Sequence, residues 1–354
     1  MNIYHFIGDF KYGGVEIAAK SSLVELNNNN NFFIVSIGKL DSKLMNTLSD
    51  YEKTKILELN FRSLCIFNQI FLFSNFLKAN PPDIFLFSLW KSSFLGLLLH
   101  YFYKNSLFIS FIHSTRFVHI LDKIFTKKAI KKFDYIFVDS KNTKDFVSGF
   151  SSNKNIEIVS FKILNYEGQI KTLNKNKINF LYIGRFSKHK RIDKSLDVIK
   201  KLVNKNFNIT FNLYGSDDGE INYIKDKINK LNLQNNVYIH DAVNPQNLPE
   251  IFDKHNFYLQ LSDFEGFAMS VCEAMQSGLV CCITPVGEIK NYSEDMYSAI
   301  HLKDNNMDDF VNKIVMLIQA KDRYEVISKN SLMKWKNTIS YSNDLENKIN
   351  KINK

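Results

Sequence analysis

Short apolar runs alternate with helix-like segments along most of this chain, and that alternation limits the possible folds more than any other feature. In residues 1–165 we expect strands at Ile3–Ile7, Phe32–Ile37, Ile56–Leu59, Ile84–Phe87, Leu107–Ile112, Tyr135–Val138 and Ile156–Ser160. Helices are expected at Val15–Leu26, Leu64–Leu77, Ser92–Tyr103, Ile120–Lys132 and Thr143–Phe150, and the asparagine run 27–31 is expected to be a loop. Strands that alternate with helices form a parallel, doubly wound α/β sheet.

The same alternation returns after a polar stretch, residues 166–178, which is typical of a linker. Further strands are expected at Asn179–Ile183, Ile209–Tyr214, Val237–His240, Phe257–Leu261 and Leu279–Thr284, with helices at Ile192–Val203, Ala268–Ser277, Phe310–Ile318 and Tyr324–Trp335. We therefore predict a first domain over 1–165, a second over 179–325, and a C-terminal segment over 326–354. A chain of 354 residues is long enough for two hydrophobic cores.

The net charge of +10 favours an anionic partner, which could be nucleic acid, acidic lipid or a phosphorylated substrate. A base-reading helix motif, an aromatic RNA-binding strand and clustered arginines are all missing, so nucleic acid is not expected. The four cysteines have no C-x-x-C spacing, and we predict neither a metal site nor a cofactor. The N-terminus shows no basic region followed by a long apolar core, so no signal peptide is expected.

The stretch Ser262–Ala274, SDFEGFAMSVCEA, carries two carboxylates eight positions apart. Glu265 follows a predicted strand, and Glu273 lies about two turns into a helix if that helix begins just after Gly266. Ligands bind at the carboxyl ends of strands in open α/β sheets. The backbone amides of Gly266, Phe267 and Ala268 would be free there to meet an anionic group. Carboxylates beside such a helix end suit a nucleotide sugar, although a helix cap and an ordinary helix residue would also explain the two acids.

The loop Gly184–Asp193, GRFSKHKRID, places Arg185 and Lys190 just before a predicted helix. Two cations beside the positive end of a helix can stabilise a diphosphate, especially as a nucleoside diphosphate departs. A surface basic loop is the simpler alternative.

In the first domain, the pair Gly13–Gly14 precedes a helix and could let the backbone approach a phosphate, or simply form a tight turn. His113 follows the strand Leu107–Ile112 and can reach the same edge of the sheet, with Arg116 close behind. The lysine-rich segment Asp122–Phe133 is either a solvated face or a site that docks on anionic lipid. The segment Leu64–Leu77 is either a buried core helix or one that faces a membrane.

At these motifs the chain resembles the retaining glycosyltransferases of family 4, which have the GT-B fold. Their phrase S-x-x-E-G-F-x-x-x-x-x-E-A-M is matched in register by Ser262, Glu265, Gly266, Phe267, Glu273, Ala274 and Met275. The resemblance implies two Rossmann-like domains facing a central cleft, with a C-terminal helix that returns to the first domain. It also implies that Glu265 contacts the donor sugar near its reacting carbon and that Glu273 holds the ribose hydroxyls.

The family's G-R-x-x-x-x-K phrase is similar to Arg185–Lys190, which would hold the leaving diphosphate. Arg191 stands where a glycine usually follows that lysine. By the same resemblance Gly13 and Gly14 would lie beside the diphosphate, the loop at Gly215 near the base, and His113 near the acceptor.

The resemblance identifies the expected function as retaining, metal-independent hexosyl transfer from a nucleotide-diphosphate sugar to a glycan or lipid-linked acceptor. Bacterial cell-surface polysaccharide synthesis, of lipopolysaccharide, O-antigen or capsule, is the expected setting. The expected location is cytoplasmic, with a peripheral position on the inner membrane face as a further option. The alternative is a catalytically silent GT-B-like subunit or scaffold of a membrane-associated glycan assembly.

Overall fold

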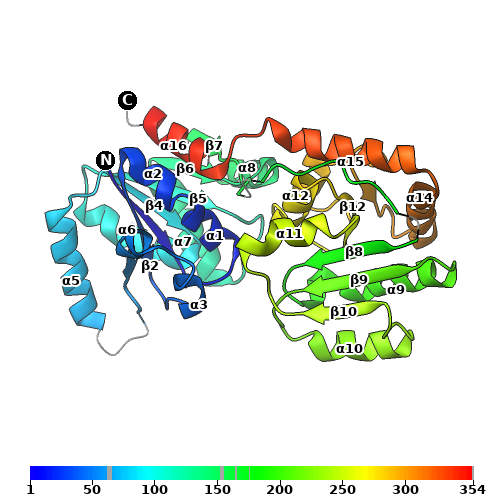
Figure 1. Cartoon of the computed structure of the whole chain (residues 1–354). Helices are drawn as coiled ribbons and strands as arrows, with labels where there is room; N and C mark the ends of the chain where they lie inside the picture. Colours follow the sequence, from blue (N-terminus) through cyan, green and yellow to red (C-terminus); the bar gives the residue numbers. More distant parts are fainter. Residues whose placement is uncertain (62–65, 152–154, 164–165, 175, 353–354) are drawn as a thin grey trace. The chain divides into compact units, whose positions relative to one another are not determined.

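The chain forms two compact units, each built around one parallel sheet (Figure 1). The computed structural model describes residues 1–61, 66–151, 155–163, 166–174 and 176–352. The first unit combines Met1–Ile163 with Ile339–Lys354, and the second is Leu164–Thr338.

The first sheet has seven parallel strands in the order β3-β2-β1-β4-β5-β6-β7. They are β1 (Asn2–Ile7), β2 (Asn31–Ser36), β3 (Ile56–Glu58), β4 (Ile84–Ser88), β5 (Leu107–Ile112), β6 (Tyr135–Val138) and β7 (Asn155–Ile158). Ile3 lies opposite both Phe32 on β2 and Ile84 on β4, which fixes the register at the centre of the sheet. The predicted doubly wound sheet is confirmed, because these runs are apolar on both faces and only a sheet covered on both sides buries them.

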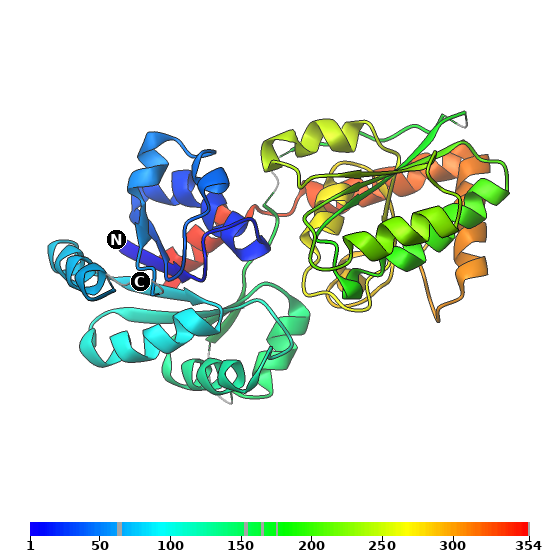
Figure 2. The same ribbon diagram turned by 90° about the horizontal axis from the view of Figure 1, so that it is seen from below.

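Helices cover both faces of this sheet (Figure 2). They are α1 (Gly14–Ser21), α2 (Leu23–Asn29), α3 (Ser42–Met45), α4 (Asp50–Thr54), α5 (Ile66–Ala79), α6 (Trp90–Phe102), α7 (Ile120–Lys132), α8 (Lys141–Ser148) and α16 (Tyr341–Ile352). Helices α5 and α6 pack on an aromatic core that includes Tyr4, Phe33 and Phe87, and α7 packs against α6. Helices α1, α2 and α16 contact one another.

Two local predictions near the N-terminus are wrong. The helix expected over 15–26 is divided at Ser22, whose hydroxyl donates to the carbonyl of Ala18, and such back-bonding bends helices. The asparagine run is not a loop, since α2 continues to Asn29. The side chain of Asn27 bonds both the N–H and the C=O of Phe32, which joins the helix end directly to β2.

Helix α5 occupies most of the segment expected over 64–77, of which residues 64 and 65 lie outside the described part of the chain. Its side chains face two ways: Phe73 and Phe76 pack on the core, whereas Phe71 is exposed.

The second sheet has six parallel strands in the order β10-β9-β8-β11-β12-β13. They are β8 (Ile178–Ile183), β9 (Ile209–Tyr214), β10 (Val237–His240), β11 (Phe257–Gln260), β12 (Val280–Ile283) and β13 (Ile300–His301). The helices are α9 (Ile192–Asn204), α10 (Ile221–Lys230), α11 (Leu248–Asp253), α12 (Met269–Gln276), α13 (Ile289–Tyr292), α14 (Met307–Gln319) and α15 (Lys321–Lys336), with short 3₁₀ turns η1 (Lys188–Lys190) and η2 (Pro245–Asn247). Strand β13 was not predicted because two residues are too few to show a period.

The C-terminal helix belongs to the first unit, as expected. Helix α15 packs on α12, α14 and β12, whereas α16 packs on α1 and α2. Asp344 of α16 accepts a hydrogen bond from the backbone N–H of Ser160, 2.7 Å away. None of the helices in the described ranges combines the length and the apolar character needed to cross a bilayer.

A glycine sets the distance between α6 and the first sheet. A Cβ on Gly96 would lie 2.8 Å from the ring of Phe133 and 2.9 Å from that of Phe87, both fully buried. We expect Gly96→Ala to lower the free energy of unfolding by about 1–3 kcal/mol through overpacking, although alanine favours helices. Denaturant unfolding would measure this.

The matched control is Gly149→Ala at the end of α8, where the nearest atom to the new Cβ is 3.4 Å away. It should change stability by much less. Equal effects of the two substitutions would contradict this account of α6 packing.

Candidate active site

The Glu265 carboxylate lies at the centre of a hydrogen-bonded cluster beyond β11. Its Oε1 atom accepts from Lys190 Nζ at 2.7 Å, from Gln260 Nε2 at 2.8 Å and from Ser262 Oγ at 2.5 Å. The side chains of Lys190 and Glu265 are only 14% and 8% exposed. One carboxylate oxygen is therefore saturated with donors, and a partly buried cation compensates the charge.

The loop that carries Lys190 is tied to the loop that carries Glu265 by three further contacts. The backbone N–H of Asp263 donates to the carbonyl of His189 at 2.8 Å. The ring of His189 stacks on Phe264 at 4.6 Å. Burial, and then the Lys190 charge, lower the pKa of His189, so this imidazole is neutral at pH 7. The third contact is made by Arg191.

Arg191, at the position where the resembled family usually has glycine, adopts the left-handed conformation with φ 49° and ψ 45°. That backbone costs a non-glycine residue about 1–2 kcal/mol. Its guanidinium binds both oxygens of Asp193 at 2.9 Å and Asp263 Oδ1 at 3.0 Å. The tight turn is therefore made without glycine, and its strain is offset by charge-assisted hydrogen bonds that join the two loops.

Glu273 lies on α12, which begins at Met269 and not directly after Gly266. Glu273 is thus just over one turn into the helix, and the expected position two turns into the helix is wrong. The helix starts later than expected because Ala268 adopts a left-handed conformation (φ 61°). Burial raises the pKa of Glu273 to about 8. Ser270, one turn earlier on the same helix, contacts Gln260, which in turn donates to Glu265. No ion pair or side-chain hydrogen bond joins Glu273 to the described residues.

Arg185 follows β8, and its side chain is 64% exposed, with one ion pair to Asp218 at 3.2 Å. Its charge, like that of Lys190, lowers the pKa of His189. Gly215, at the end of β9, has a structural role of its own. A Cβ there would lie 1.9 Å from the carbonyl oxygen of Gly184, and only glycine lets the two strand ends approach so closely.

The backbone around Gly266 is packed against a second turn. Gly266 accepts from the N–H of Glu288 at 2.9 Å, and Phe267 accepts from the hydroxyl of Tyr292 at 3.0 Å. Gly287 has a φ of 59°, and a Cβ there would lie 2.1 Å from the carbonyl oxygen of Glu265. The phenyl ring of Phe267 packs on Tyr292. The peptide segment 265–268 is thus held rigidly.

The remaining predicted residues lie in the first unit. Gly13 is the N-cap of α1, and a Cβ on it would lie 2.3 Å from the carboxylate of Glu16; Gly14 is the first residue of that helix. His113 and Arg116 line a small cavity of about 220 Å³ together with Val15 of α1. The structure therefore brings these residues to one edge of the first sheet.

His113 is part of a buried polar chain that the sequence did not reveal. Its Nε2 atom lies 3.0 Å from Ser88 Oγ, which lies 2.8 Å from His5 Nε2. The Nδ1 atom is 3.8 Å from Asp139 Oδ2. Burial, with His113 nearby, lowers the pKa of His5 to about 3, so His5 stays neutral. The available indication was a polar residue in otherwise apolar strands, at His5 of β1 and Ser88 of β4.

Metal ligation has no obvious location in this site. In the part of the chain that the structure describes, no three His, Cys, Asp or Glu side chains are grouped as a metal ion requires.

The raised pKa of Glu273 predicts a pH-dependent cost to stability. From about pH 4.5 to pH 8 the carboxyl is ionised in the unfolded chain but protonated in the folded one, so the free energy of unfolding falls by up to about 1.4 kcal/mol per pH unit. We expect Glu273→Gln to remove this fall. Its stability advantage over the original protein should grow from pH 5 to pH 8 and then level off.

Denaturant titrations at several pH values measure the difference, with Glu167→Gln at an exposed position as the control. Parallel pH profiles for Glu273→Gln and the original protein would show that the carboxyl ionises normally.

Comparison with known proteins finds a family match over the segment that carries these motifs. Residues 167–333 match the family described as Glycosyl transferases group 1. An uncharacterized glycosyltransferase of Methanocaldococcus jannaschii is 26% identical over 226 residues, which cover 60% of this chain and 56% of that protein. An uncharacterized 41.2 kDa protein in the cps region of Klebsiella pneumoniae is 27% identical over 227 residues, 57% of this chain and 59% of that protein. The matches thus span little more than half the length of these relatives.

Solved structures agree on the fold. The crystal structure of Anabaena HepE in complex with UDP superposes with a TM-score of 0.82 over 100% of both chains, at 13% identity. Such a likeness confirms the two Rossmann-like sheets of the GT-B fold and, at this identity, nothing finer. The family match over residues 167–333 covers the segment that carries Arg185, Lys190, Glu265 and Glu273, and the structural likeness extends the GT-B fold to the whole chain.

Proposed function

We propose that this protein is a retaining, metal-independent hexosyltransferase that uses a nucleotide-diphosphate sugar. The observation that carries the proposal is the 2.7 Å contact between Lys190 and Glu265. It brings a cation suited to a departing diphosphate next to a carboxylate suited to the positive charge that develops on the sugar carbon.

The diphosphate would be held by Arg185 and Lys190. The Arg185 side chain is 64% exposed and can turn toward a ligand, while Lys190 Nζ gives one of its three hydrogens to Glu265 and has two left. Glu273 would accept the two ribose hydroxyls. The peptide segment at Gly266, Phe267 and Ala268, together with Gly13, Gly14 and Gly215, completes the proposed donor site.

The hydrogen bonds to Glu265 favour an electrostatic role for this carboxylate over a covalent one. An oxygen that already accepts three hydrogen bonds is a poor nucleophile, so a covalent intermediate on Oε1 is disfavoured. The bond from the sugar carbon to the phosphate oxygen breaks as the acceptor oxygen bonds the same face of that carbon. The acceptor proton passes to the leaving phosphate. His113, with Arg116, would position the acceptor.

The acceptor we propose is a glycan or a lipid-linked saccharide of a bacterial cell surface, as in lipopolysaccharide, O-antigen or capsule synthesis. The relative in a Klebsiella cps region supports this setting. The UDP bound to Anabaena HepE supports a nucleoside diphosphate as the leaving group. The reaction would take place on the cytoplasmic side of the membrane.

Loss of either charge should lower turnover sharply. We expect Glu265→Gln and Arg185→Ala each to lower kcat/KM by about 10²–10³-fold, because each removes charge stabilisation in the transition state. A panel of nucleoside diphosphates in a thermal-shift assay identifies the donor base. Transfer or hydrolysis of the matching labelled nucleotide sugar then measures activity.

Lys254→Ala, at an exposed position of the second unit, is the control and should leave kcat/KM unchanged. If the unsubstituted protein binds a nucleoside diphosphate but never turns over the matching nucleotide sugar, it is instead the catalytically silent subunit.

Nucleotide binding should release a proton from Glu273. At pH 7 a carboxyl with a pKa of about 8 is mostly protonated, and accepting two hydroxyl donors favours its ionised form. Calorimetry in buffers of different ionisation enthalpy should show a net release of up to about one proton per bound nucleoside diphosphate. The release should vanish in Glu273→Gln and shrink with the 2′-deoxy nucleotide; an unchanged release in both would remove Glu273 from the ribose site.

A further inference from the structure

Helix α6 exposes a row of large apolar side chains on the side turned away from the sheet. Phe94, Leu98, Tyr101 and Phe102 are 42%, 49%, 73% and 73% exposed. Their spacing of four, three and one places them on one side of the helix, while Leu95 and Leu99 pack on the aromatic core. An amphipathic helix normally has one apolar side, which is buried. Helix α6 has a second apolar side, and that side is exposed.

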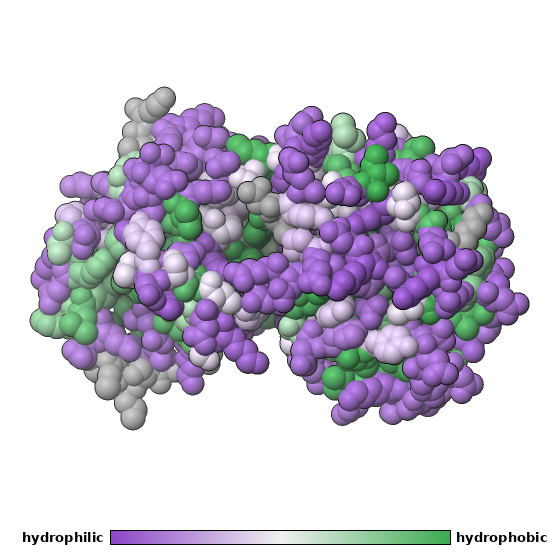
Figure 3. All heavy atoms as spheres, viewed as in Figure 1, coloured by the Kyte–Doolittle hydropathy of each residue, from purple (hydrophilic) through white to green (hydrophobic). Residues whose placement is uncertain are grey.

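Helices α5 and α7 of the same layer also expose apolar side chains. Ile70, Phe71 and Leu72 of α5 are 47–63% exposed, and Figure 3 shows hydrophobic residues gathered over α5. Ile120, Leu121 and Ile124 of α7 are 40–72% exposed. We name these six residues and the four of α6 the apolar face. An exposed set of this size on one layer marks an interaction surface.

The exposed charges on α5, α6 and α7, and on the residue that closely follows α6, have one sign. Helices α5 and α6 contain no acidic residue, and the one acid of α7, Asp122, is buried and accepts from Val118 and Thr126. The lysines of this layer are Lys78, Lys91, Lys104, Lys123, Lys127, Lys128, Lys131 and Lys132. None of them forms an ion pair with a carboxylate of the described residues, and Lys91, Lys104 and Lys127 lie over aromatic rings.

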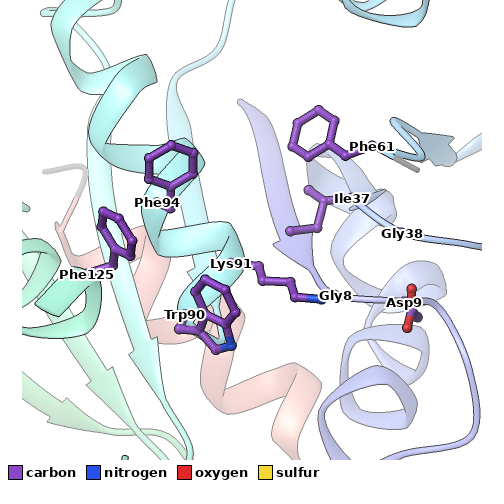
Figure 4. A pocket seen from close by; sticks show the side chains of 9 residues that line it. All are labelled: Gly8, Asp9, Ile37, Gly38, Phe61, Trp90, Lys91, Phe94 and Phe125. Carbon is purple, nitrogen blue, oxygen red and sulfur yellow. The ribbon is translucent and has the colours of Figure 1, made fainter. Parts of the chain in front are cut away.

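An apolar pocket of about 370 Å³ opens at one end of this face. In Figure 4, Phe94 of α6 and Phe125 of α7 lie on one side of it, and Ile37 and Phe61 lie on the other, with Trp90 below. A sugar would need several polar partners here, and the lining offers the side chains of Asp9 and Lys91 and the indole N–H of Trp90. Asp9 already accepts from the N–H of Lys39. The lining suits a hydrocarbon chain.

We propose that the apolar face docks on an anionic lipid bilayer and that this pocket receives a hydrocarbon chain of a lipid in that bilayer. Phe94 belongs to both surfaces, so a chain can pass from the bilayer into the pocket without crossing water. Exposed aromatic and aliphatic side chains bordered by unpaired lysines are the combination that binds anionic membrane surfaces. That the chain is the anchor of the acceptor rests on the proposed function; the docking itself does not.

A second copy of this chain is a poorer occupant of the same face. Self-association through it would bring lysines against lysines, on a chain whose net charge is already +10.

Vesicle flotation tests the docking. The full chain should float with vesicles that contain phosphatidylglycerol at low salt, remain unbound with phosphatidylcholine alone, and be released by high salt. The double substitution Tyr101→Ser, Phe102→Ser should weaken binding by about tenfold, as should Lys123→Glu with Lys128→Glu. Tyr223→Ser with Lys225→Glu, at exposed positions of α10 in the second unit, is the matched control and should leave binding unchanged.

Tryptophan quenching tests the pocket. The chain has two tryptophans, and Trp335→Phe leaves Trp90, in the pocket lining, as the sole reporter. Phosphatidylglycerol brominated on its acyl chains should quench Trp90 in the bound protein, and non-brominated lipid should not. Flotation without quenching would overturn the pocket assignment.

No flotation, or flotation equal in the α6 and α10 variants, would overturn the docking, as would a dimer in solution that the Tyr101→Ser, Phe102→Ser protein fails to form. These outcomes are separate from the transferase proposal. The thermal shift by nucleoside diphosphates tests residues of the second unit and needs no membrane. If no nucleoside diphosphate stabilises the protein but the protein still floats with vesicles, the transferase proposal fails and the docking proposal stands.

Discussion

The contact between Lys190 and Glu265 joins two loops that leave different strands of the second sheet. Because both side chains are largely enclosed, removing one partner would leave the other as an uncompensated charge. The carboxylate is also fixed by Gln260 and Ser262, so its position is set by three donors and not by the backbone alone. Everything proposed for donor chemistry depends on this fixed charge pair.

Unusual backbone geometry surrounds the pair. Arg191 and Ala268 have left-handed backbones and lie at the starts of α9 and α12. Gly287 is also left-handed, and its turn packs closely against the carbonyl of Glu265. Strain of this kind persists where the surroundings over-determine a conformation, and it collects at functional sites. At Arg191 the cause is visible, since Asp193 and Asp263 hold the guanidinium. The same contacts make the two loops one rigid body.

Two groups of helices in the first unit differ in the side chains that they expose. Helices α1, α2 and α16 pack together and close the fold, whereas α5, α6 and α7 keep apolar side chains and lysines outward. The two alternatives for the segment at 64–77, core helix or lipid-facing helix, are therefore not exclusive on α5. Phe73 and Phe76 fill the core while Phe71 remains outside.

The sequence by itself determined the two parallel sheets, the order of most strands and helices, and the candidate acids and cations, because apolar periodicity and motifs at strand ends are local patterns. The tertiary structure decided which of these groups meet. Lys190 and Glu265 are 75 positions apart, and His5 and Ser88 are 83 apart, so no local pattern could pair them. Helix α12 starts late because Ala268 is left-handed. The left-handed Arg191 and the continuation of α2 to Asn29 depend on side-chain contacts. Such contacts form only when the packed chain brings distant strand ends together.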